Sequence, residues 1–253
     1  MDRFAFTSLS AVKSQAEVRA QITNSLANVS TTGFKESYET ATQTAMIEGD
    51  GFESRFVPTI VKQDIIKLTP GSVMTTGNPM DVAFNDKTVL GIQAENGDIA
   101  FTRRGDLRVT STGLIETAVG DLVMGEGGPI TAPPGQIISI APNGSIFAGS
   151  AVNPEEEPAL IGQLMLRDAS ETPLVRREDG LFEPLDSEFK GADFPNGPNL
   201  ASLQSGRLEG SNANPIETMV KLIDFSRSFE AQIKMIKQSE SIDENGSTMM
   251  RLP

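Results

Sequence analysis

The sequence predicts an α+β fold, in which paired N- and C-terminal amphipathic helices form a helical assembly domain and an antiparallel β-rich domain is inserted between them. Apolar residues recur at helical spacing near both termini. Gly and Pro instead interrupt the middle of the chain every few residues and leave short alternating runs between them. We therefore assign 1–35 and 205–253 to the helical domain, 36–75 to an extended linker or hairpin, and 76–204 to the β-rich domain.

The first helix is predicted by an apolar stripe that runs toward a stop signal at Gly33. The pattern sets a length of about 25 residues. Such a stripe ordinarily packs against the chain's own core, and contact with another subunit is the alternative. The stripe consists of Leu9, Val12, Ala16, Ile22, Leu26 and Val29.

The linker is weakly periodic and rich in Thr, Gly and acidic residues, so we expect at most one hairpin in it, near Phe56–Ile66. The β-rich domain that follows contains two strong hairpin signals, Asn96-Gly97 and Asn143-Gly144, whose residues accept positive φ. Its predicted strands are Pro79–Phe84, Thr88–Ala94, Ile99–Thr102, Leu107–Thr110, Leu114–Thr117, Leu122–Met124, Ile137–Ile140, Ser145–Phe147, Leu160–Arg167 and Leu181–Glu183.

The last helix begins with a strong start signal, because Asn214 suits the cap, Pro215 suits the first helical position and Glu217 suits a capping box. Glu217 and Lys221 are four residues apart in the favourable order. We expect Asn245-Gly246 to end the helix. Its apolar seam follows the spacing of a coiled coil and consists of Met219, Leu222, Ser226, Phe229, Ile233 and Ile236, widened by Ile216, Val220 and Ile223.

Two helices make a thin core, so their remaining apolar surface indicates neighbouring subunits. The sequence therefore predicts a building block of a large assembly. The predicted assembly interface consists of Leu9, Val12, Ala16, Ile22, Asn24, Leu26, Asn28, Val29, Met219, Leu222, Ile223, Phe229, Ile233 and Ile236.

Composition argues against several other classes of protein. The net charge of −13 disfavours nucleic acid as a partner. The chain has no Cys and no His, which removes thiolate chemistry and the commonest ligand of transition metals, and we expect no catalytic residue, metal or cofactor. No apolar run is long enough to predict membrane insertion, and the N-terminus lacks the pattern of a cleavable signal peptide.

Two terminal motifs carry a resemblance to a known family. The run Asn24-Ser-Leu-Ala-Asn-Val-Ser-Thr-Thr-Gly-Phe-Lys35 and the run Leu208-Glu-Gly-Ser-Asn-Ala-Asn-Pro-Ile-Glu217, followed by Ile223-Asp-Phe-Ser-Arg-Ser-Phe-Glu230, resemble the two signatures of the axial proteins of the bacterial flagellum, which build its rod and hook. Ser25 and Ala213 stand where the family usually has Asn and Val. In the middle of the chain, Thr76–Ala83, Phe101–Leu107 and Gly113–Thr117 also resemble the family.

The resemblance implies a structural subunit of the basal-body rod, which spans the periplasm. The C-terminal sequence most resembles that of a proximal-rod subunit, and a distal-rod or hook-family subunit is the alternative. Such subunits pass through the flagellar type III export apparatus without a cleaved signal. They then polymerise, with copies of themselves and with neighbouring rod proteins, into a tube that transmits torque and encloses the export channel. The terminal helices form the inner wall, and the β domain lies outside.

Two alternatives come from other classes. A secreted hydrolase of cell-wall polymer needs two positioned carboxylates, and Asp81, Asp106 and Glu116 are the only candidates. An adhesin needs exposed aromatic residues on loops, and aromatic residues make up only 6% of this chain. The roles of Asn24, Asn28 and Gly33 stay open between capping of the helix end and bonds across subunits.

Overall fold

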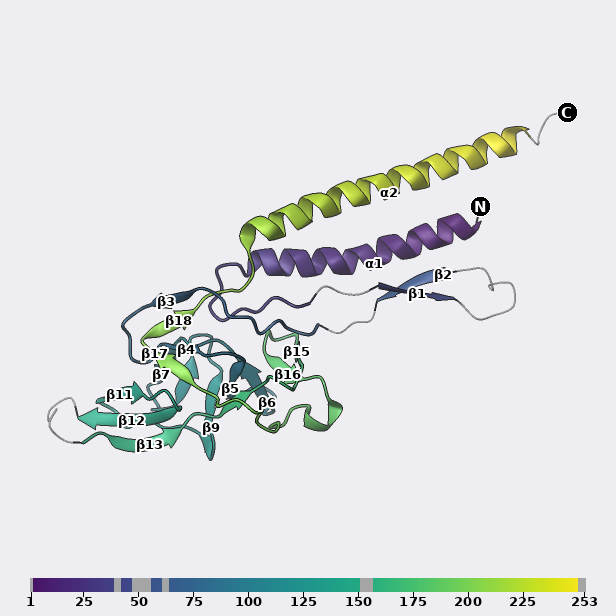
Figure 1. Ribbon diagram of the computed structural model, residues 1–253. Coiled ribbons are helices and arrows are strands. Elements are labelled where there is room, and N and C mark those ends of the chain that lie inside the picture. The colour runs from purple at the N-terminus through teal and green to yellow at the C-terminus, as the bar shows by residue number, and fades with distance from the viewer. Residues whose placement is uncertain (1, 39–41, 47–55, 61–63, 151–156, 250–253) are drawn as a thin grey trace. The chain divides into compact units, whose positions relative to one another are not determined.

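The computed structural model describes residues 2–38, 42–46, 56–60, 64–150 and 157–249 (Figure 1). The fold is α+β, as predicted, and most of its elements are strands. The chain divides into two compact units, which we call the helical unit (1–27, 39–63 and 214–253) and the β unit (28–38 and 64–213). Each unit draws on segments that are far apart in the sequence.

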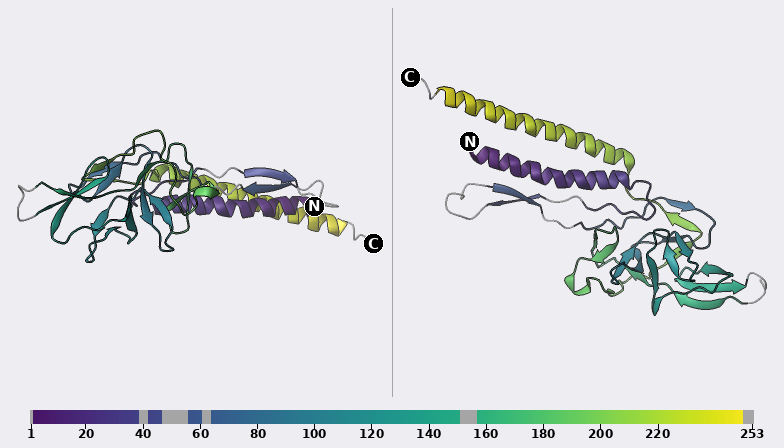
Figure 2. Two further views of the ribbon diagram at one scale, coloured as in Figure 1. Left: turned by 90° about the horizontal axis from the view of Figure 1, so that it is seen from below. Right: turned by 180° about the vertical axis from the view of Figure 1, so that it is seen from behind.

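The helical unit contains α1, the β1–β2 hairpin and α2. No Gly or Pro interrupts α1, and in α2 Pro215 occupies only the first position. Strand β2 lies beside α1, as both views in Figure 2 show. The elements are α1 (Asp2–Ala27), β1 (Thr42–Met46), β2 (Phe56–Ile60) and α2 (Pro215–Met249).

The N-terminal end of α2 confirms the predicted cap. The Oδ1 atom of Asn214 accepts hydrogen bonds from the amides of Ile216 (3.0 Å) and Glu217 (3.4 Å). Glu217 also pairs with Lys221 at 3.0 Å. The predicted end at Asn245-Gly246 is wrong, since α2 continues to Met249. A Gly inside a helix costs only about 1 kcal/mol relative to Ala, so one Gly does not have to end it.

The β unit is built around a nine-stranded sheet with the order β15-β16-β6-β5-β9-β8-β7, in which β14 also pairs with β5 and β10 with β9. A three-stranded sheet, β11-β12-β13, and the pairs β17–β4 and β18–β3 complete the unit. The strands are β3 (Val73–Thr75), β4 (Val82–Phe84), β5 (Thr88–Gln93), β6 (Ile99–Thr102), β7 (Leu107–Val109), β8 (Ile115–Thr117), β9 (Leu122–Gly125), β10 (Gly128–Pro129), β11 (Gln136–Ile140), β12 (Ser145–Ser150), β13 (Ala159–Gln163), β14 (Leu166–Asp168), β15 (Leu174–Arg176), β16 (Phe182–Pro184), β17 (Leu203–Ser205) and β18 (Arg207–Glu209), with a 3-10 turn at Ser187–Phe189.

Both predicted hairpins are confirmed. Gly97, with φ of 87°, turns β5 into β6, and Gly144, with φ of 84°, turns β11 into β12. The predicted strand Leu160–Arg167 is in fact two strands. The first, β13, pairs with β12, and the second, β14, pairs with β5, so the chain changes partner between them. The linker 36–75 contains a hairpin, but β2 (Phe56–Ile60) pairs with β1 (Thr42–Met46) and not within the expected stretch Phe56–Ile66. Strand β3 is a further strand of this region.

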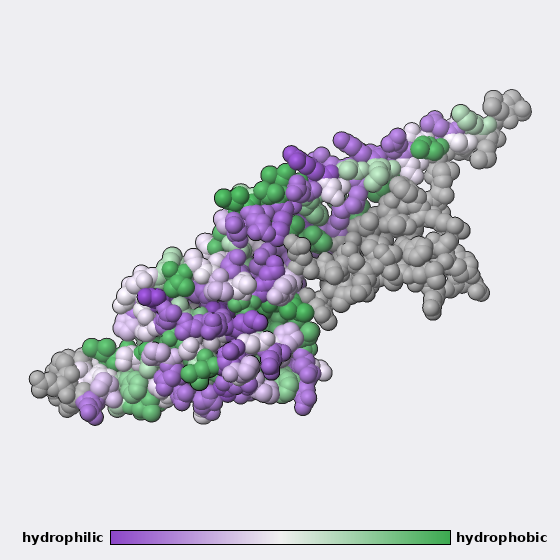
Figure 3. All heavy atoms as spheres, in the orientation of Figure 1, coloured by the Kyte–Doolittle hydropathy of each residue, from purple (hydrophilic) through white to green (hydrophobic). Residues whose placement is uncertain are grey.

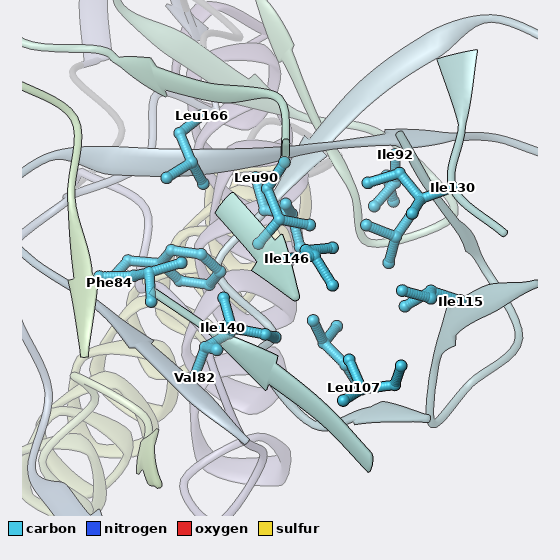
Figure 4. Close-up of a cluster of buried hydrophobic side chains, with 14 of the residues drawn as sticks. Val82, Phe84, Leu90, Ile92, Leu107, Ile115, Ile130, Ile140, Ile146 and Leu166 are labelled. Atoms are coloured by element: carbon cyan, nitrogen blue, oxygen red, sulfur yellow. The ribbon is translucent and has the colours of Figure 1, made fainter. Parts of the chain in front are cut away.

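The core of the β unit consists of two apolar clusters. The larger one collects Val, Ile, Leu and Phe side chains from β4, β5, β7, β8, β11, β12 and β14, which point toward one another in Figure 4. The smaller one is centred on Phe101 and Phe194, whose rings meet edge to face at 4.6 Å between centroids. Because both clusters belong to the β unit, this unit has a core of its own.

Candidate functional site

Three charged side chains lie buried together in the β unit, and each comes from a different part of the chain. Lys35 is the last residue of the first terminal motif, Arg103 follows β6, and Glu209 ends β18. The Lys35 Nζ atom donates to Glu209 Oε1 at 2.6 Å, and the Arg103 Nε atom donates to Glu209 Oε2 at 2.8 Å. Their side chains are 0%, 0% and 1% exposed, so this is an ion cluster removed from water.

Arg103 also fixes the turn between β4 and β5. Its guanidinium donates to three backbone carbonyl oxygens, those of Phe84 (2.7 Å), Asp86 (2.6 Å) and Thr88 (3.1 Å). Asp86 has a positive φ of 46°, which is uncommon for a residue other than Gly. A planar group with several fixed donors suits this arrangement, and a Lys at position 103 cannot reproduce it.

Two glycines let the backbone reach the cluster. At Gly33, with φ of 69°, an added Cβ atom would lie 2.4 Å from the carbonyl oxygen of Arg103. At Gly71, it would lie 2.3 Å from the carbonyl oxygen of Gly210. The amides of Gly33 and Gly71 both donate to Glu209, to its carbonyl oxygen and its Oε1 atom respectively, at 2.8 Å. Gly33 therefore requires Gly for both conformation and space, and Gly71 requires it for space.

Asn212 links the same segments from the other side. Its side-chain Oδ1 atom accepts a hydrogen bond from the backbone amide of Glu36 at 2.6 Å, and its backbone amide donates to the carbonyl oxygen of Phe34 at 3.2 Å. Its Nδ2 atom donates to the carbonyl oxygen of Lys67 at 2.9 Å and to Thr69 Oγ1 at 3.1 Å. One amide side chain thus joins the segments 34–36 and 67–69.

The same segments continue the nine-stranded sheet beyond β15. The amide of Ile66 donates to the carbonyl oxygen of Leu174 in β15 at 2.9 Å, and the amide of Tyr38 donates to the carbonyl oxygen of Ile65 at 2.7 Å. Arg176 of β15 also donates to the carbonyl oxygen of Lys35 and lies 4.3 Å above the Phe34 ring. The cluster is therefore tied directly to the sheet.

The electrostatics of the cluster follow from one carboxylate facing two cations. Burial, and then the positive charge of Arg103, lower the pKa of Lys35 from 10.5 to about 8, although Glu209 acts in the opposite direction. Burial also lowers the pKa of Arg103. The charged form of Lys35 is thus destabilised in the folded β unit.

The carboxylates that a hydrolase would need are engaged in other contacts. Asp106 pairs with Arg104 at 2.7 Å and Glu116 with Arg108 at 2.6 Å. Asp81 accepts a hydrogen bond from Asn78 at 3.0 Å. Among the residues that the structure describes, no group of three acidic side chains could hold a metal ion, and no helix is long and apolar enough to cross a membrane.

The predicted assembly residues lie on the two helices and the turn after α1. Ala16, Asn24, Met219 and Ile223 are exposed, the last two by 52% each, and the side chain of Leu9 lies outside the described part. The half-buried members are Val12, Ile22, Leu26, Asn28, Val29, Leu222, Phe229, Ile233 and Ile236. Asn28 accepts a hydrogen bond from the Thr31 hydroxyl at 3.1 Å, in the turn that follows α1.

Exposed apolar side chains gather on the first turns of α2 (Figure 3). Ile216 is 74% exposed, and Val220 is 51% exposed. Together with Met219 and Ile223, these residues follow the spacing of one helix face. Met219 belongs to the predicted seam, and Ile216, Val220 and Ile223 are the residues that were predicted to widen it.

Sequence reasoning did not identify Lys35, Arg103, Glu209 or Asn212 as a site. Three of them lie inside the terminal motifs, but apolar periodicity carries no information about polar residues in extended segments. The small residues beside two of them, Gly33 and Gly210, were the one local signal that the backbone packs closely there.

Comparison with known proteins identifies the family of the chain. Residues 204–249 match the family model described as flagellar basal body rod FlgEFG protein C-terminal. The chain is 37% identical to the flagellar basal-body rod protein FlgF of Salmonella typhimurium over 97% of this chain and 96% of that protein. The chain belongs to the flagellar basal-body rod protein family. It is also 33% identical to FlgF of Escherichia coli over 100% of this chain and 98% of that protein. The rod protein FlgG of Buchnera aphidicola (strain APS) is 28% identical over 87% of this chain and 89% of that protein.

Proposed function

We propose that the chain is a structural subunit of the flagellar basal-body rod, and specifically of its proximal part. The observation that carries this proposal is the similarity to FlgF rod proteins over nearly the whole chain, at 33% to 37% identity. A rod protein named FlgG, of Buchnera aphidicola, is 28% identical and covers 87% of this chain. The rod proteins are structural, and the engaged carboxylates of the β unit fit that role better than catalysis.

We also propose that α1 and α2 pair through their apolar stripes and polymerise with their neighbours. Burial supports this proposal, because four of the six seam residues, Leu222, Phe229, Ile233 and Ile236, are half-buried. The other two, Met219 and Ser226, are exposed, as is Ile216 on the adjoining face at 74%. An exposed apolar face of this kind is typical of a surface that another subunit covers. The neighbours would be further copies of the chain and other rod proteins, with the type III export apparatus as a partner during secretion.

Isolation of basal bodies from the source bacterium tests the proposal. We expect mass spectrometry to detect the chain in purified basal bodies, and deletion of its gene to abolish rod completion and motility. Detection in the cell envelope but not in basal bodies would contradict the proposal, as would a motile deletion strain. Restoring the gene in the deletion strain is the control that assigns the loss to this chain.

A further inference from the structure

The chain passes between the helical unit and the β unit at four places, 27/28, 38/39, 63/64 and 213/214. Inside the β unit, these crossings continue into three segments, 28–38, 64–71 and 209–213. All three segments meet at the buried cluster of Lys35, Arg103 and Glu209. The crossings are therefore attached to one place in the fold.

The bonds at this place run between segments and not only within them. The amide of Gly33 bonds Glu209 and that of Glu36 bonds Asn212, which join 28–38 to 209–213. The Gly71 amide bonds the Glu209 carboxylate, which joins 64–71 to 209–213. The Lys35 ammonium bonds the carbonyl oxygen of Thr69 at 3.0 Å, which joins 28–38 to 64–71.

We infer that Lys35, Arg103, Glu209 and Asn212 form a clamp that holds the four crossings as a single cooperative element, so that a force applied at any crossing acts on the whole sheet of the β unit. The clamp is anchored in the sheet through Arg103, which bonds the turn between β4 and β5, and through Arg176 of β15. Without the clamp, each crossing would carry force independently of the others.

Cooperativity follows from burial. If one segment leaves the clamp, the remaining segments keep a charge or a polar group that is shut off from water and has lost its partner. Opening one contact therefore raises the free energy of the others until all are solvated, and a network of buried hydrogen bonds opens together. In a rod subunit, such an element would pass torque between the terminal helices and the β unit; that consequence rests on the proposed function.

Hydrogen exchange of the purified full-length chain tests cooperativity. The reporters are the backbone amides of Gly33, Glu36, Gly71 and Asn212. The Asn212→Ala variant removes the hydrogen-bond acceptor of the Glu36 amide, but the acceptors of the Gly33 and Gly71 amides are on Glu209 and stay in place. We expect Gly33 and Gly71 also to exchange at least about tenfold faster in the variant, since the side chain loses hydrogen bonds to Glu36, Lys67 and Thr69 and each lost bond changes an opening equilibrium about fivefold. Gly91, which bonds Met165 within the nine-stranded sheet, should keep its rate.

The matched control is Asn199→Ala, which removes an amide that bonds Ser170 at 2.9 Å elsewhere in the β unit. It should leave all four reporters unchanged. The clamp is overturned if Asn212→Ala accelerates only Glu36, because the segments are then held independently. Equal acceleration of Gly91 overturns it as well, because the crossings then open only with the whole β unit.

Single-molecule pulling tests the transmission of force. The chain has no Cys, so Ser111→Cys on the β unit and Lys237→Cys on α2 provide two unique attachment points. We expect Asn212→Ala to lower the force at which the β unit ruptures and Asn199→Ala to leave it unchanged. An unchanged rupture force in Asn212→Ala would overturn the mechanical role. Absence of the chain from basal bodies would overturn the proposed function instead, so the two failures are distinguishable.

Discussion

Glu209 carries the negative charge at the centre of the clamp and faces two cations, Lys35 and Arg103. Replacing it by Gln leaves both cations buried, and either orientation of the amide points an N–H group at another donor. We expect Glu209→Gln to lower the free energy of unfolding by about 3–5 kcal/mol. Denaturant unfolding followed by fluorescence of Tyr38, the single Tyr of the chain and a residue of the β unit, measures the change.

The Lys35→Met variant should cost less, about 1–2 kcal/mol. Glu209 keeps Arg103 and the Gly71 amide, and the carbonyl oxygen of Thr69 keeps a contact with Asn212 at 3.4 Å, so no acceptor is left alone. The control is Glu116→Gln, which breaks an ion pair whose Arg108 side chain is 57% exposed. Such pairs contribute roughly 0–1 kcal/mol. A cost for Lys35→Met as large as that of Glu209→Gln would contradict this account of the charges.

Lys35 also makes a prediction about pH. Its pKa is about 8 in the folded chain, against 10.5 as the ordinary value, so between these limits the unfolded chain binds more protons. The contribution of Lys35 to the free energy of unfolding is therefore lowest below pH 8 and rises as the pH increases toward 10.5. The gain is up to about 3 kcal/mol. We expect the free energy of unfolding of the native chain to rise relative to that of Lys35→Met across this window, and a constant difference would show that Lys35 does not titrate there.

At the scale of elements, α2 carries the seam proposed for assembly. Phe229 lies near its middle, half-buried, with its ring stacked 6.2 Å from that of Phe225. We expect Phe229→Asp to block incorporation into rods, because the change removes about 1.5–3 kcal/mol of burial and places a carboxylate in an apolar contact. The β unit should keep its fold, which circular dichroism and melting of the purified variant check.

The matched variant is Lys237→Asp, which introduces the same side chain at an exposed position of the same helix. It should support motility better than Phe229→Asp. Normal assembly of Phe229→Asp would show that the helices do not pack through this seam. Melting of the β unit by that variant would show that the seam belongs to the same core as the sheets.

Local signals were sufficient to predict α1, the cap of α2 and the hairpins at Gly97 and Gly144, because each depends on residues adjacent in sequence. They did not predict β3, β15, β17 or β18, although the equally short β4, β7, β8 and β16 were predicted. Strand β17 pairs with β4 and β18 with β3, and partners so far apart in the sequence leave no local pattern. The clamp was missed for a related reason. Lys35 and Glu209 are 174 residues apart, and nothing in either neighbourhood indicates its partner.

At the scale of the whole molecule, the sequence and the structure place different boundaries around the part that folds by itself. The sequence predicts 76–204, whereas the clamp adds 28–38 and 209–213 to the β unit. We expect limited proteolysis of the dilute chain to leave 28–38 associated with 64–213, since the buried Lys35–Glu209 ion pair and the part-buried Glu36–Asn212 hydrogen bond hold these segments. Helices without assembly partners should be cut first, because their exposed apolar faces do not offset the ordering of the backbone.

Mass spectrometry of the protected material under native conditions checks this outcome. Release of 28–38, or trimming of the C-terminal end to a residue before Glu209, would support the shorter boundaries and contradict the clamp. Protection of α1 and α2 in the dilute chain would show that the helical unit is stable without neighbours.

The central claim is that this chain is a rod subunit whose terminal helices make the assembly contacts. An electron cryo-microscopy map of the intact basal body of the source bacterium tests it most directly. We expect α1 and α2 of this chain in the inner wall of the proximal rod, packed against the helices of neighbouring subunits, with the β unit on the outside. A map in which the β unit lines the channel, or in which the rod contains no density for this chain, would contradict the account.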